Sequence, residues 1–374
     1  MNDITINGLN VKKARAVSID CGNLAMKSKS DRGERHYLNT LNEDNGYGGV
    51  MIWDNDDKKA QTIYEYNGKR YYVGEMDMDS RYSLDANTSR YSTPDFKTMF
   101  VISVYQHIQN QGEHVRVVTG IPGKQYRGRE EAQEQFNKLR GKHTVNNVTF
   151  YIDEIHVELQ PLATAIYLGV NENGKQKEGG ERFMDSLILV LDLGMGTTDV
   201  TILNKQRIMD VYELKHSMFN IYNRIIKKMQ DLRGDDGKLT ILASEHITAQ
   251  EVEKQIRESL NSDDKRAMYT ANNGDEFVID DIVKEAFQWG ANDFIKELSS
   301  QKVVFEQFAN VVLTGGGTQT LLPYLKDALS QFRGNSKVKF RIPDDVIKAN
   351  ARGYYIIAKN PDKFLNKPAA KSRV

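Results

Sequence analysis

The chain has 374 residues, with 51 Lys and Arg residues against 51 Asp and Glu residues, and a single cysteine. The balanced charge excludes a global field that would draw the protein to DNA or to an anionic membrane, and one cysteine excludes an internal disulfide. No stretch approaches the roughly 20 apolar residues that span a bilayer, and residues 1–7 lack the cationic, apolar character of a signal peptide, so we expect a cytoplasmic protein of two domains.

The first feature in chain order is an acidic turn between two short strands, within residues 16–27. The turn reads Asp20-Cys-Gly22-Asn23, and its glycine lets backbone N–H groups approach an anion because no Cβ intervenes. Lys27, on the return strand, would reach a phosphate as a point charge. The stretch predicts one half of a phosphate site.

Residues 31–93 are polar and contain a predicted β-hairpin. Ile63–Tyr66 would pair with Arg70–Val73 across an Asn67-Gly68 turn, which is the turn chemistry that two-residue hairpins prefer. We expect this segment to be a small subdomain inserted in the first half of the chain.

Two helices are predicted after this segment. One begins at Pro94 and is capped by Thr93. The other begins at Gln160-Pro161, after a strand over 148–157, and is rich in small residues. An uncharged Gln at the head of a helix would orient a water molecule without taking its proton, which suits slow phosphate hydrolysis.

A second acidic turn lies in residues 189–203, between two apolar strands. Its two glycines free the backbone to approach an anion and its two threonines add hydroxyl donors: Gly194, Gly196, Thr197 and Thr198. Acidic residues beside a phosphate cradle would repel the ligand unless a cation lay between them. Asp192 and Asp199 therefore predict a hydrated Mg²⁺.

A third glycine motif follows the strand 310–314. Gly315, Gly316, Gly317 and Thr318 lead into a predicted helix, and bare glycine backbone leaves room for a flat group such as a purine. Since the first two turns lie about one domain length apart, the chain is predicted to contain a duplicated fold whose halves close on one phosphate chain.

Taken in order, these motifs resemble those of the actin, heat-shock-70 and sugar-kinase superfamily. The resemblance implies an α/β, actin-like fold, with two duplicated ribonuclease-H-like lobes around a nucleotide cleft. Lobe I would span 1–168, with its small subdomain at about 31–93. Lobe II would span 187–374, with a small subdomain at about 231–305. Residues 169–186 would be the linker, and a C-terminal helix at about 345–358 would return to lobe I.

Within that superfamily the chain resembles the bacterial and archaeal actin-like proteins of the ParM group. The likeness lies in residues 20–27, 63–74 and 117–122. It implies an ATPase (GTP is possible) that forms filaments with itself in a nucleotide-dependent way and drives plasmid DNA segregation. The implied partner is a DNA-binding adaptor at a centromere-like site, without direct nucleic-acid binding or membrane contact.

The resemblance also implies roles for single residues. Asp20 and Asp192, with Asp199, would hold Mg²⁺ through water, and the adenosine would lie on residues 315–317. Gln160 would position the attacking water. Glu158 is an alternative, because many relatives of this group have Glu at the position assigned to Gln160. The Gln-Pro-x-Ala phasing favours Gln160. A sugar or carboxylate kinase of the same fold is the alternative function, although a kinase needs a base where the neutral Gln is placed.

Overall fold

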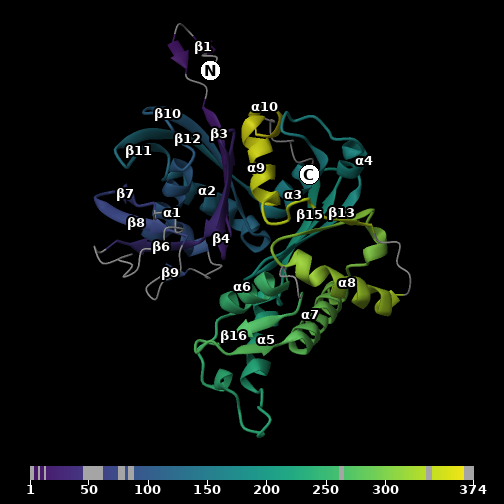
Figure 1. The fold of residues 1–374 in the computed structure, drawn as a ribbon. Helices are drawn as coiled ribbons and strands as arrows, with labels where there is room; N and C mark the ends of the chain where they lie inside the picture. Colours follow the sequence, from purple (N-terminus) through teal and green to yellow (C-terminus); the bar gives the residue numbers. More distant parts are fainter. Residues whose placement is uncertain are drawn as a thin grey trace.

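A computed structural model describes residues 4–6, 9–11, 14–44, 62–74, 81–82, 88–260, 265–333 and 339–365. In this part of the chain two sheet-based lobes lie on either side of a pair of helices, and a mostly helical unit extends from the second lobe (Figure 1). No helix within these ranges is long and apolar enough to cross a membrane.

The first lobe is built on one mixed sheet. Its described strands lie in the order β5-β4-β3-β10-β12-β11-β7-β8-β6-β9. Their bounds are β3 (Arg15–Cys21), β4 (Ala25–Ser30), β5 (Gly33–Leu38), β6 (Thr40–Glu43), β7 (Tyr64–Tyr66), β8 (Lys69–Val73), β9 (Arg81–Tyr82), β10 (Glu113–Ile121), β11 (Gly141–Val145) and β12 (Val148–Leu159). A separate pair, β1 (Ile4–Ile6) and β2 (Leu9–Val11), precedes them.

Helical segments complete this lobe: η1 (Thr88–Ser92), α1 (Pro94–Tyr105), η2 (Gly123–Gly128) and α2 (Arg129–Asn137). The predicted cap of α1 is confirmed, since Thr93 Oγ1 accepts the N–H of Phe96 at 3.2 Å. Successive side chains of β10 point to opposite faces of the sheet, and both faces are covered. Val117 joins the apolar core with α1 and α2, whereas Val118 joins the core on the opposite face.

The predicted hairpin is also confirmed. Tyr64 lies opposite Tyr71 in the antiparallel pair β7–β8. Asn67 and Gly68 have φ of 53° and 75°, the left-handed conformations that this turn needs.

The second lobe has a smaller sheet of order β15-β14-β13-β18-β19. These strands are β13 (Leu187–Leu193), β14 (Thr198–Asn204), β15 (Arg207–Leu214), β18 (Asn310–Thr314) and β19 (Phe340–Arg341). The remaining elements are α5 (Met218–Gln230), η3 (Ile241–Ala243), α6 (Ala249–Leu260), β16 (Met268–Thr270), β17 (Glu276–Val278), α7 (Asp280–Ser300), η4 (Phe305–Gln307) and α8 (Thr318–Arg333). Asp192 lies opposite Asp199 in β13–β14 and beside Thr314 in β13–β18, so the second acidic turn and the glycine motif meet at one sheet end.

Two helices cross between the lobes: α3 (Gln160–Gly169) and α9 (Ala349–Lys359). α3 packs on β13, β14 and β18 of the second sheet, and α9 packs on β3, β4 and β10 of the first. They touch closely, since a Cβ on Gly353 would lie 2.0 Å from the carbonyl oxygen of Ala163. Each lobe is therefore covered by a helix that joins it to the other.

Two of these connections differ in detail from expectation. The last long helix begins at Ala349 rather than near 345, because Asp345 Oδ1 accepts the N–H groups of Ile347 and Lys348 in a turn before it. The stretch 169–186 contains the short helix α4 (Gly180–Met184), whose Phe183 is buried. A further short helix, α10 (Pro361–Phe364), follows α9.

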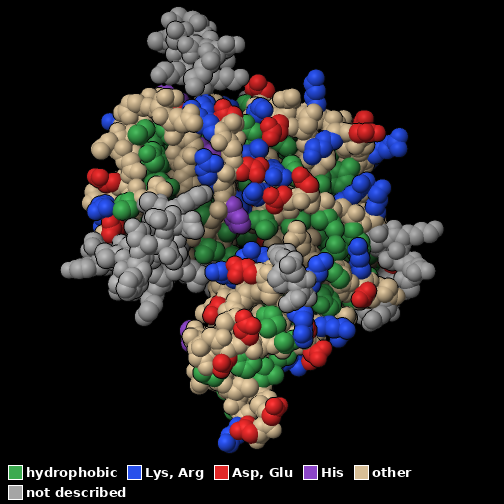
Figure 2. Space-filling model, in the orientation of Figure 1, with side chains coloured by type: hydrophobic (Ala, Val, Ile, Leu, Met, Phe, Trp, Pro, Cys, Tyr) green, Lys and Arg blue, Asp and Glu red, His purple; other side chains and the backbone are tan. Residues whose placement is uncertain are grey.

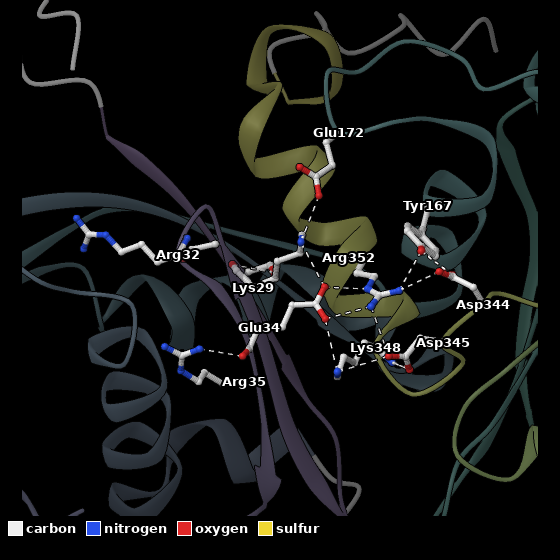
Figure 3. Close-up of polar contacts among 12 residues, drawn as sticks. Lys29, Arg32, Glu34, Arg35, Tyr167, Glu172, Asp344, Asp345, Lys348 and Arg352 are labelled. Carbon is white, nitrogen blue, oxygen red and sulfur yellow. Dashed lines mark hydrogen bonds and ion pairs between the residues drawn. The ribbon is translucent and has the colours of Figure 1, made fainter.

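A cluster of charged side chains fastens α9 to the first lobe. Glu34 on β5 accepts two hydrogen bonds from Arg352 on α9, at 2.8 and 3.1 Å. Lys29 and Lys348 also pair with Glu34, and Arg352 donates to the Tyr167 hydroxyl on α3. Figure 3 shows Glu34 between these cations, and Figure 2 shows charged side chains gathered in the middle of this face. The cluster ties together the first sheet and both crossing helices.

Candidate functional site

The two acidic turns approach each other from opposite lobes. A Cβ on Gly196 would lie 2.7 Å from Nδ2 of Asn23, so the β13–β14 turn faces the β3–β4 turn at side-chain contact distance. Gly196 itself is exposed. The structure thus brings together the two turns that the sequence predicted to act on one ligand.

Asp20 lies at the end of β3, and both of its carboxylate oxygens have partners. Lys27 Nζ lies 3.2 Å from Oδ2, and Gln160 Nε2 donates to Oδ1 at 3.2 Å. Lys27 Nζ also lies 2.6 Å from where a Cβ on Gly22 would be, so the glycine makes room for the ammonium group. Asp20, Lys27 and Gln160 form one contact group in the first lobe's half of the site.

Asp192 is the corresponding carboxylate of the second lobe. Its Oδ2 accepts a hydrogen bond from Asn350 Nδ2 of α9 at 2.9 Å. Burial raises the pKa of Asp192 to about 6, and the nearby Asp20 charge adds to the rise, while the Asn350 hydrogen bond opposes it. A nearby cation would stabilise the ionised form of such a buried carboxylate and lower its pKa.

Asp199 joins the lobes directly. Its Oδ1 accepts the backbone N–H of Gly123, in η2 of the first lobe, at 2.7 Å, and its Oδ2 accepts the Thr197 hydroxyl at 3.3 Å. Burial, and then the charge of Asp192, raise its pKa to about 7. The structure therefore gives Asp199 a bridging contact that the sequence did not suggest.

The glycines of the second and third motifs serve different needs. Gly194 donates its N–H to the Thr197 carbonyl at 2.9 Å and closes its own turn. Gly315 has φ of +86°, and a Cβ there would lie 2.5 Å from Asp192 Oδ1, while a Cβ on Gly317 would meet Met218. Around Gly316 no atom lies within 4 Å of an added Cβ. Open space at the third motif is therefore found at Gly316, whereas its neighbours need glycine for close packing.

Two predicted threonines are fully buried. Thr318 donates its hydroxyl to the Thr314 carbonyl at 2.6 Å, at the start of α8. Thr198 lies in β14, and its hydroxyl has no partner among the described residues. Thr198 thus lies within the sheet and Thr318 in the first turn of a helix, and neither side chain reaches solvent.

Glu158 lies two residues before Gln160, on β12. It is opposite Gly120 of β10, and the ring of Tyr354 from α9 covers that glycine, since a Cβ on Gly120 would lie 1.6 Å from the Tyr354 hydroxyl. Burial raises the pKa of Glu158 to about 7. The Glu158 side chain forms no hydrogen bond with the carboxylates of the two turns.

Sequence reasoning missed several residues of this region. Asn350 and Tyr354 lie in the C-terminal helix predicted at about 345–358, within which the sequence singles out no residue for the site. Arg90 and Gly123 come from short segments with no motif, and only the tertiary structure places them beside the turns.

The carboxylates fit a hydrated cation better than a directly bound one. Within the described ranges no group of three or more His, Cys, Asp or Glu side chains is placed to hold a metal ion. Asp20 and Asp192 nevertheless interact electrostatically, and a divalent ion with its water shell would satisfy both, since Mg²⁺ gives up its water reluctantly.

Residues 18–162 match the family model "Actin like proteins N terminal domain". The solved structure of the actin-like protein Alp7A is similar, with a TM-score of 0.72 and 15% identity over 93% of this chain and 96% of that chain. No curated protein sequence matches the chain.

Two further solved structures are similar. A 15-stranded ParM filament from Clostridium botulinum has a TM-score of 0.66 and 19% identity, over 93% of this chain and 100% of that one. The archaeal actin homologue Ta0583 in complex with ADP has a TM-score of 0.61 and 13% identity, over 92% of this chain and 99% of that one.

Proposed function

From the premise that this chain is an actin-like protein, which shares the actin-like fold over 93% of its length and matches the N-terminal domain of that family in residues 18–162, we propose that it is a filament-forming ATPase. Nucleotide would bind between the lobes, with its phosphates between the β3–β4 and β13–β14 turns. Hydrolysis would alter how the lobes close and so how subunits fit together.

The observation that carries this proposal is the approach of the two turns. Asn23 in one lobe and Gly196 in the other lie within contact distance, and each turn has a buried carboxylate at its base, Asp20 or Asp192. A phosphate chain placed there would touch both lobes at once. Such a ligand couples its own chemistry to the angle between them.

Mg²⁺ is the cation that this site suits. Asp20 and Asp192 would hold it through water, and it would neutralise charge on the phosphate oxygens. Lys27 adds a fixed positive charge on the side of the first turn, beside Gly22. The open space at Gly316 would take the base. The ADP bound to Ta0583 supports an adenine nucleotide as the ligand.

For hydrolysis, we assign the positioning of the attacking water to Gln160. The side chain is nearly buried and its amide nitrogen is held by Asp20, which leaves its amide oxygen to accept a hydrogen bond from water. Glu158 remains the alternative, because a carboxyl whose pKa is about 7 can take a proton at neutral pH.

Self-assembly is supported by the filament structure of the similar ParM. Segregation of plasmid DNA, through a DNA-binding adaptor that docks on the filament, is the biological role that this likeness suggests. The adaptor is needed because the balanced charge of the chain offers no field for DNA.

The proposal is tested by light scattering and phosphate release on one sample, with Mg²⁺ and ATP, GTP, ADP or no nucleotide. We expect scattering to rise with a triphosphate, phosphate to follow, and electron microscopy to show filaments. Equal scattering under all four conditions would contradict the coupling. Transfer of phosphate to a small molecule instead of water would favour the kinase.

A further inference from the structure

Arg90, in η1 of the first lobe, is a buried cation that forms no ion pair with any residue that the structure describes. The residue is 6% exposed, and among the described residues no carboxylate forms an ion pair with it. Its Nε has no hydrogen-bond acceptor there either. A buried charge without a counter-ion costs free energy. A bound anionic ligand near Arg90 would reduce this cost.

The guanidinium holds the first turn of the site. Nη1 donates to Oδ1 of Asn23, and Nη2 donates to the Cys21 carbonyl at 3.0 Å. Asn23 is the residue whose Nδ2 faces Gly196 of the other lobe. Since the side-chain oxygen of Asn23 is fixed by Arg90, its NH₂ group is directed toward the second turn.

A second set of contacts leads from Arg90 to the other lobe. Nη2 also lies 3.4 Å from the Tyr91 hydroxyl, which donates to Gln125 Oε1 at 2.6 Å. Gln125 belongs to η2, whose Gly123 N–H binds Asp199. Hydrogen bonds and one short helical segment thus connect the first turn to Asp199, beside the second turn.

We propose that Arg90 is a positioning residue for the nucleotide's phosphate chain and that it favours the binding of a nucleoside triphosphate over that of a diphosphate. It orients the Asn23 amide toward the second turn and supplies the positive charge that the bound phosphates balance. A triphosphate carries more negative charge than a diphosphate, so Arg90 stabilises bound ATP more than bound ADP. This inference rests on the function proposed above and adds a discriminating group to it.

The test uses the full chain and four variants. Arg90→Gln removes the charge, and Arg90→Lys keeps the charge but loses the forked geometry. Tyr91→Phe removes only the hydroxyl that links Arg90 to Gln125. Tyr37→Phe is the matched control, since it removes a hydroxyl of the same lobe whose hydrogen-bond partner is Ser103 and not a residue of either turn. For each, titration calorimetry gives Kd for ATP and ADP with Mg²⁺, and phosphate release gives kcat and KM.

We expect Arg90→Gln to weaken ATP binding on the order of tenfold, with a smaller effect on ADP and a raised KM. Arg90→Lys should recover part of the loss, Tyr91→Phe should show a lesser loss, and Tyr37→Phe should match the parent. If Arg90→Gln does not fold, the ATP and ADP affinities of Arg90→Lys and Tyr91→Phe provide the test.

Unchanged ATP affinity in the Arg90 variants, or equal losses for ATP and ADP without recovery by Lys, would overturn this inference while leaving the proposed function intact. A parent chain that binds neither nucleotide overturns both.

Discussion

The ionised forms of Asp192 and Asp199 are each destabilised by burial in the folded protein. Burial raises the pKa of Asp192 to about 6 and that of Asp199 to about 7. For such groups the unfolded chain holds fewer protons than the folded one as pH rises from about 4 to 7, so their ionisation lowers stability over that range. A bound cation reverses this cost. This cost is consistent with the Mg²⁺ proposed for the site.

Gln160 and Glu158 can be separated by substitution. We expect Gln160→Ala to slow phosphate release on the order of 100-fold, because the attacking water loses its orienting amide, while ATP-dependent scattering still rises. Glu158→Gln should have a much smaller effect on the rate. Gln106→Ala is the control, since Gln106 bonds to Tyr64 away from the turns. A slow Glu158→Gln variant beside a normal Gln160→Ala variant would transfer the role to Glu158.

At the scale of elements, the crossing of α3 and α9 depends on one small residue. Gly353 packs against the backbone of Ala163 so closely that no side chain fits between the helices. Backbone cannot move aside as a flexible side chain does, so the helices would have to separate.

We expect Gly353→Ala to lower the free energy of unfolding by about 3 kcal/mol, measured by urea denaturation. Gly128→Ala is its control, because no atom lies within 4 Å of a Cβ there and its φ is −100°. Equal stability of the two variants would show that the helices do not pack as described.

The charged cluster around Glu34 provides a pH-dependent contribution of its own. Its partners Arg352 and Lys29 outweigh partial burial and lower the pKa of Glu34 from 4.5 to about 2. The folded state thus favours the ionised form. This stabilisation is complete above about pH 4.5 and is lost as pH falls toward 2.

Glu34→Gln should therefore destabilise the protein by about 1–2 kcal/mol at pH 7, and the difference from the parent should shrink as the pH falls below 4.5. Glu253→Gln, which removes a more exposed pair with Arg257 on one helix, serves for comparison. A difference that is the same at pH 7 and pH 3 would exclude the ion pairs as its cause.

At the scale of the whole molecule, the sequence was most informative where motif and local structure coincide. The Asn67-Gly68 hairpin, the Thr93 cap and the strand–glycine–helix unit from Asn310 to α8 each follow from a local rule. The actin-like fold followed from the order of the motifs.

What the sequence could not supply were contacts between distant segments. From the sequence Asp199 is predicted to hold the metal at the second turn. In the structure it also accepts the backbone N–H of Gly123 in η2, which is 76 residues away in the sequence. Gly315 reads as open backbone, yet it is crowded by Asp192. These roles depend on which side chains are buried and on how distant elements pack, and the spacing of residues within a motif predicts neither.

The central claim is that one carboxylate from each lobe acts on the same magnesium triphosphate. A double-mutant cycle of Asp20→Asn and Asp192→Asn, read as ATP affinity with Mg²⁺ and again with EDTA, tests it most directly. We predict that the two losses are coupled by roughly 0.5 kcal/mol or more with Mg²⁺. With EDTA this coupling should give way to one of opposite sign, because only the direct repulsion between the two carboxylates remains. Additive losses in Mg²⁺, or no loss from one of the two substitutions, would contradict the account.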